Sequence, residues 1–90
     1  MNETTQDLVQ QGLTAARVGD IEDARLLLKQ ATDQQPENVN AWLALAGVVE
    51  SLAEKERCFS RVLELDPHNE EARAGLVRVE QKLEAQTPAE

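Results

Sequence analysis

The chain has 90 residues, a length that fits one small domain with a limited core. Its net charge of −8 argues against nucleic acid or an anionic membrane as partner, because nine Lys and Arg residues are scattered among seventeen acidic ones. Aromatic residues make up only 2%, so the core has to be built from leucine, valine and alanine, which suit closely packed helices.

The spacing of apolar residues predicts five helices and no strand. The helices are expected at about residues 5–18, 21–34, 39–50, 52–65 and 70–85. In the first, Leu8, Gly12 and Ala15 recur at helical spacing. Gly19 can adopt the left-handed conformation that ends many helices, and Asp20 can cap the helix that follows.

Two turns along the chain resemble each other. Residues 31–38 and 62–69 each end a helical pattern with a proline, followed two residues later by an asparagine. Proline cannot continue a helix, and asparagine is a good cap for the next one. Pro67 follows Pro36 by 31 residues, so the chain is predicted to repeat one supersecondary unit.

The third helix differs from the others because residues 39–49 leave almost no polar face. Such a helix is expected to be buried on all sides, packed between the second, fourth and fifth helices. Ser51 and Glu54 form a capping-box pattern that starts the fourth helix. The fifth helix has one apolar face, made by Ala72, Leu76, Val79 and Leu83. Residues 87–90 are expected to form a tail or linker.

Small and large residues are spaced as in a known repeat family. The first unit carries Leu8, Gly12, Ala15, Ala24, Leu28, Ala31 and Pro36, and the second carries Trp42, Leu45, Ala46, Val49, Phe59, Val62 and Pro67. These residues resemble the tetratricopeptide repeat (TPR), a helix-turn-helix unit of about 34 residues. Lys55 departs from the pattern, since it stands where the family usually has alanine, and the turn before it is about three residues short.

The resemblance implies an all-α fold of antiparallel helix-turn-helix repeats, a TPR-like α-solenoid with two repeats and a C-terminal capping helix. The domain would cover residues 1–86, with repeat 1 at about 5–36, repeat 2 at about 39–67, the capping helix at about 70–85 and the tail at 87–90.

In this family the first helix of each unit lines a concave groove that binds peptides. Carried onto this chain, the partner-binding residues are Val9, Leu13, Arg17, Asn40, Leu43, Ala44, Gly47, Arg78 and Lys82. They combine an apolar floor with a basic rim. The positions at which some members hold a C-terminal carboxylate are here Gln6, Gln10, Asn40, Ala44, Glu71 and Gly75, so that clamp is absent. The alternative is that the apolar residues pack under the last helix or against a second copy.

No catalytic or metal-binding pattern accompanies these residues. Trp42 matches a position between the paired helices and is expected in the core rather than exposed as a binding anchor. Cys58 has no nearby histidine or cysteine partner in the sequence and is expected to be an inert thiol. His68 is expected to be solvated. We therefore expect no enzyme activity, cofactor or metal.

The sequence thus predicts a protein–protein interaction module, a scaffold or adaptor that binds a peptide or helix. The alternative is a self-assembly module, either a homodimer or the terminal part of a larger repeat array, because few repeats bury little core on their own. A single cysteine, a polar N-terminus without signal-peptide features and the lack of a long apolar run point to the cytoplasm.

Overall fold

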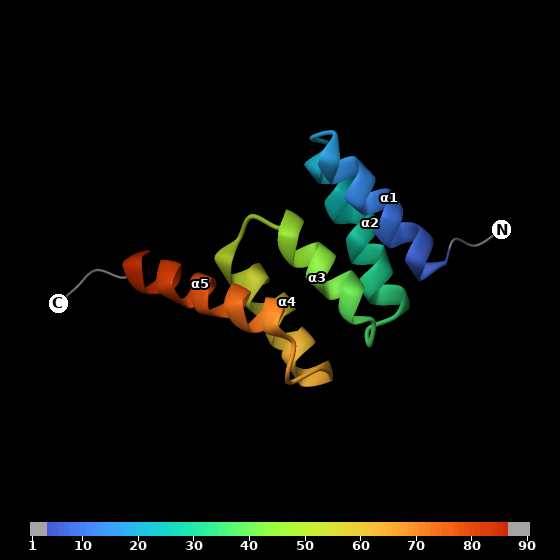
Figure 1. The fold of residues 1–90 in the computed structure, drawn as a ribbon. Helices are drawn as coiled ribbons and strands as arrows, with labels where there is room; N and C mark the ends of the chain where they lie inside the picture. The colour runs from blue at the N-terminus through green and yellow to red at the C-terminus, as the bar shows by residue number, and fades with distance from the viewer. Residues whose placement is uncertain (1–3, 87–90) are drawn as a thin grey trace.

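The computed structural model describes residues 4–86. Within them the chain forms five helices and no strand (Figure 1), which confirms the all-α prediction. The helices are α1 (Thr5–Arg17), α2 (Ile21–Gln34), α3 (Val39–Val48), α4 (Leu52–Leu65) and α5 (Glu70–Gln86). The largest deviation from the expected bounds is in α3, which ends at Val48 and not at Glu50. The predicted tail at 87–90 lies outside the described residues.

Polar side chains cap the helix N-termini, where the first backbone N–H groups have no partner within the helix. The hydroxyl of Ser51 accepts a hydrogen bond from the backbone N–H of Glu54 at 3.4 Å, which is the first half of the predicted capping box. A complete box forms at α1, where Thr4 and Asp7 each accept from the other's backbone N–H. Local sequence therefore determines where these helices begin.

The two proline–asparagine turns have the same local geometry. Gln35 and Asp66 adopt φ/ψ angles of −135°/85° and −141°/86°. Each donates its N–H to the carbonyl four residues earlier, at 3.0 and 2.7 Å. The side-chain oxygens of Asn38 and Asn69 then accept from the backbone N–H three residues later, at 3.0 and 2.8 Å. The two turns are therefore alike in backbone geometry as well as in sequence.

Each helix packs against the next one in the chain, and α1 also packs against α3. The core consists of small and aliphatic side chains, as the composition requires. Ala24, Leu28, Ala31, Ala41 and Val62 are completely buried. The far end of the molecule is closed by α5, which packs on α4 through Ala72, Gly75 and Val79.

The prediction that α3 is buried on every side is wrong. Ala41, Leu45, Ala46 and Val48 are buried, but Leu43 and Ala44 are only half-buried and Gly47 is exposed. The main neighbours of α3 are α1, α2 and α4, and the predicted packing against α5 is largely missing. Instead α5 lies alongside α4, so one side of α3 stays open.

Trp42 also differs from its expected place in the core. Its ring packs against the core but is only half-buried. The indole Nε1–H donates to the carbonyl oxygen of Pro36 at 2.7 Å, which holds the ring near the turn between α2 and α3. The ring stays partly uncovered because it lies beside a hollow between α2 and α4.

Two glycines let helices approach each other closely. A Cβ atom added at Gly12 of α1 would lie 2.6 Å from Cγ of Leu28, which is completely buried on α2. A Cβ atom added at Gly75 of α5 would lie 2.4 Å from Cζ of Phe59 on α4. Gly47 is different, because nothing lies within 4 Å of an added Cβ there.

These contacts predict opposite effects for the same substitution at two helical glycines. Gly12→Ala should lower the free energy of unfolding by about 1–3 kcal/mol, because the new methyl group overpacks against Leu28. Gly47→Ala should raise it by about 0.5–1 kcal/mol, because alanine favours the helix and meets open space. Urea denaturation followed by circular dichroism measures both, and equal effects at the two sites would contradict the packing described.

Candidate binding groove

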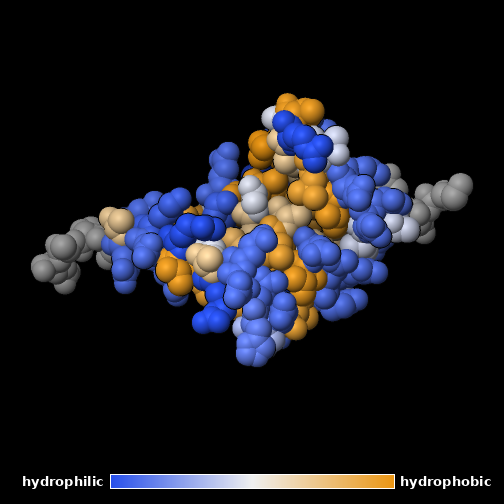
Figure 2. All heavy atoms as spheres, in the orientation of Figure 1, coloured by the Kyte–Doolittle hydropathy of each residue, from blue (hydrophilic) through white to orange (hydrophobic). Residues whose placement is uncertain are grey.

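A hollow of about 720 Å³ runs along the side of α1 and α3 that is not covered by other helices. We call it the α1–α3 groove. Its lining is Gln6, Val9, Gln10, Leu13, Ala16, Asn38, Asn40, Leu43, Ala44, Gly47, Val48 and Glu71. Six of the nine residues predicted to bind a partner belong to this set. Figure 2 shows apolar surface near the centre of the molecule, bordered by hydrophilic side chains.

The floor of the groove is apolar and partly open to solvent. Leu13 is 42% exposed, so part of its aliphatic side chain is available to a partner. Leu43 and Ala44 are half-buried, and Val9 is buried beneath them. The open space at Gly47 allows another chain to approach the backbone of α3 closely.

The rim of the groove carries amides and almost no charge. Gln6, Gln10 and Asn40 are exposed, and each amide offers both hydrogen-bond donors and an acceptor. Asn38 already uses its side chain to cap α3 and to donate to Oε1 of Gln35 at 3.0 Å. Glu71 is the one charged side chain in the lining. The groove is therefore suited to hydrogen bonding with peptide groups more than to ion pairing.

The predicted basic rim lies at one end only. Arg78 and Lys82 line a smaller hollow of about 280 Å³ beside α5. This hollow shares Leu43, Gly47 and Glu71 with the α1–α3 groove, so the two are continuous. Arg17 is exposed in the last turn of α1 and lines neither hollow.

Lys55 stabilises the short turn between α3 and α4. Its Nζ donates to the carbonyl oxygen of Ala46 at 2.8 Å. That carbonyl belongs to the last turn of α3, where helix carbonyls lack partners and a positive charge is favourable. Lys55 of α4 therefore caps the C-terminal end of α3.

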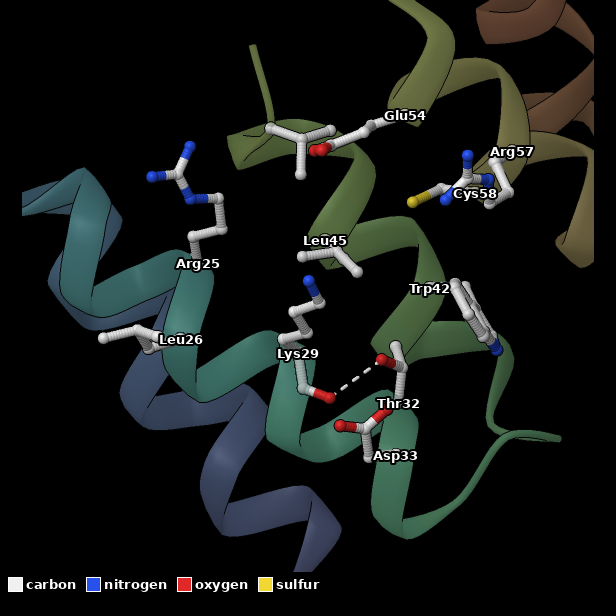
Figure 3. Close-up of a pocket in the computed structure, with 11 residues that line it drawn as sticks. Arg25, Leu26, Lys29, Thr32, Asp33, Trp42, Leu45, Glu54, Arg57 and Cys58 are labelled. Atoms are coloured by element: carbon white, nitrogen blue, oxygen red, sulfur yellow. Dashed lines mark hydrogen bonds between the residues drawn. The ribbon is translucent and has the colours of Figure 1, made fainter. Parts of the chain in front are cut away.

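A second hollow, of about 380 Å³, was not predicted from the sequence. It lies between α2, α3 and α4 (Figure 3), and we call it the α2–α4 hollow. Its lining is Arg25, Leu26, Lys29, Thr32, Asp33, Trp42, Leu45, Val49, Glu54, Arg57 and Cys58. The sequence did contain one indication of a charged surface here. Arg25 and Lys29 are four residues apart and therefore lie on the same face of α2.

Cys58 borders this hollow but is only 3% exposed. Burial, and to a smaller extent the nearby carboxylate of Glu54, raises the pKa of its thiol from 9.0 to about 11. Because the thiolate is the reactive form, the side chain is a protonated and unreactive thiol at neutral pH.

Residues 4–86 contain no cluster of histidine, cysteine and carboxylate side chains that could hold a metal ion. None of the helices in that range is long and apolar enough to cross a membrane. No protein-family model and no curated protein matches the chain.

The thiol of Cys58 should make stability fall at alkaline pH. The unfolded chain loses this proton near pH 9, whereas the folded chain keeps it to about pH 11. The unfolded state is therefore favoured as pH rises between these values, by on the order of 1–2 kcal/mol. Urea denaturation of the wild type and of Cys58→Ala at pH 8 and pH 11 measures this. The wild type should lose more stability than the variant, and parallel losses would show that Cys58 does not titrate differently on folding.

Proposed function

We propose that this chain is a TPR-like interaction module that binds a peptide or an amphipathic helix of a partner protein in the α1–α3 groove. The observation that carries the proposal is the convergence of Val9, Leu13, Leu43 and Ala44, from two helices far apart in sequence, on one uncovered hollow. Exposed apolar surface with a polar border usually marks a contact site.

Local packing supports the repeat part of this proposal. Gly12 admits the side chain of Leu28, and Ala24 and Ala31 are completely buried, as small positions between paired helices should be. The two proline–asparagine turns share one geometry. In this interpretation α1 and α3 are the first helices of two units, and α5 acts as the capping helix.

The chemistry of the groove favours a peptide over other ligands. An extended segment or helix would place apolar side chains on Leu13 and Leu43 while its backbone or polar groups meet the amides of the rim. The small side chains at Ala44 and Gly47 leave room for a partner backbone. As a scaffold or adaptor of this kind the chain would need no catalytic group, and its thiol in reduced form suits the cytoplasm.

Self-assembly is the second candidate, and the open outer side of the first hairpin favours it. Val18, at the end of α1, is 75% exposed. Another hollow, of about 550 Å³, lies along α1 and reaches Ala15 and Leu27. A second copy or a further repeat could cover this side, which would make the chain a homodimer subunit or the end of a larger array.

Leu43→Glu tests the groove, because it places a charge on the floor without entering the inter-helix core. Peptides selected from a random displayed library against the wild type should bind the variant at least about tenfold more weakly. Helicity should be unchanged, and the melting temperature should change by only a few degrees. Val77→Glu is the matched control, since Val77 is 52% exposed on α5 and lines neither hollow at the groove.

Sedimentation velocity on the same variants separates the two candidates. A monomeric wild type that binds peptides supports the interaction module. A dimer supports self-assembly, through the groove if Leu43→Glu dissociates it and through the outer side of the first hairpin if it does not. If Leu43→Glu binds and associates as the wild type does, the groove is not the functional surface.

A further inference from the structure

We propose that the α2–α4 hollow is a second docking site, which takes a short peptide segment of a partner protein carrying a carboxylate side chain next to a large apolar one. This site does not depend on the α1–α3 groove. Trp42, Leu45 and Val49 face the hollow, whereas Asn40, Leu43 and Gly47 face the groove. At about 100° per residue these two sets lie on nearly opposite sides of α3.

The apolar part of the site is a rigid aromatic surface. The hydrogen bond from Nε1 of Trp42 to the carbonyl of Pro36 satisfies the only polar group of the indole and holds the ring in place. Leu45 and Val49 also line the hollow and are buried, and Leu26 in the same lining is 63% exposed. An apolar side chain can therefore bind without displacing a hydrogen bond or ordering a flexible ring.

The charged part of the site is a group of unpaired cations. Arg25, Lys29 and Arg57 line the hollow, and they are three of the nine basic residues of the chain. The one ion pair found between residues 4 and 86 joins Arg61 to Glu64, so none of the three forms an ion pair with a carboxylate. Figure 3 shows the side chain of Lys29 directed between α2 and α3 toward Leu45. A carboxylate placed here would gain charge-assisted hydrogen bonds.

Two acidic residues in the lining lower the positive charge of the site and so limit the kind of anion that can bind. Asp33 and Glu54 reduce the local balance to one positive charge, and the whole chain carries −8. A polyanion such as nucleic acid would be repelled along most of its length. A single carboxylate is attracted locally, because charges farther away than about 8 Å are screened at physiological salt. The volume of about 380 Å³ accommodates a few side chains, which matches a short peptide segment.

Peptide binding can be measured by the fluorescence of Trp42, because it is the only tryptophan and the chain has no tyrosine. The probe is a blocked hexapeptide of alternating leucine and glutamate, titrated while tryptophan emission is recorded, with calorimetry on the same peptide as a second readout. We expect saturable binding that weakens as salt increases. A hexapeptide of leucine and lysine should not bind, and one of serine and glutamate should bind at least about fivefold more weakly.

Two surface variants test the two parts of the site without disturbing the core. Lys29→Glu should weaken binding of the leucine–glutamate peptide about five- to tenfold, because an attraction becomes a repulsion. Its control is Arg73→Glu, which makes the same charge change at an exposed position of α5 that lines none of the hollows described. Leu26→Ser should weaken binding about fivefold, with Val77→Ser as control.

The proposal is overturned if the leucine–glutamate peptide shows no saturable binding up to millimolar concentration, or if Lys29→Glu binds as the control does. Equal binding of the serine–glutamate peptide would show a simple anion site, and equal binding of single-stranded DNA would show a polyanion site. Either result would also overturn it. The emission of Trp42 and the effect of Lys29→Glu report on the other side of α3, so they do not depend on the outcome at the α1–α3 groove.

Discussion

The rest of this structure depends on the way that two proline–asparagine turns stop one helix and start the next within a few residues. Proline ends the helical hydrogen-bond pattern, and the asparagine side chain supplies the first acceptor for the following helix. Gln35 and Asp66 adopt nearly the same φ/ψ angles, so the connection from α2 to α3 resembles the connection from α4 to α5. Helices joined in this way pack on their neighbours in the chain, so the core is a series of contacts between sequential helices.

The position of α3 follows from this arrangement and links the two proposed surfaces. Its buried residues Ala41, Leu45 and Ala46 hold the first hairpin to α4. The side of α3 with Leu43 and Gly47 forms the α1–α3 groove, and the side with Trp42 borders the α2–α4 hollow. A helix of only ten residues is thus shared by both. If both surfaces bind, one short helix would connect two partners, which is what an adaptor requires.

The two surfaces differ in the charge of their lining residues as well as in their position. The groove is rimmed by amides, which can bond to any peptide backbone, so its specificity would come mainly from the shape of the apolar floor. The hollow gathers unpaired cations on an otherwise acidic chain, so its specificity would come from one well-placed carboxylate. The close helix contacts at Gly12 and Gly75 keep both surfaces on a rigid support.

The sequence by itself determined the helices, their caps and their turns, because these depend on interactions between residues three or four apart. Ser51, Asn38 and Asn69 cap where their patterns predict. Most of the groove lining was expected from the resemblance to a repeat family, which places positions such as Val9, Leu13 and Leu43 on one surface. Those predictions needed only the helical period and the resemblance to a repeat.

Only the tertiary structure decided what covers each helix. It placed α5 on α4 and left one side of α3 open, and it kept Trp42 half-buried instead of in the core. It also brought Lys55 to the carbonyl of Ala46 and assembled the α2–α4 hollow from three helices. The physical reason is that helix crossing depends on how side chains far apart in sequence fit together, as Gly75 does with Phe59. Spacing along one helix carries no information about that fit.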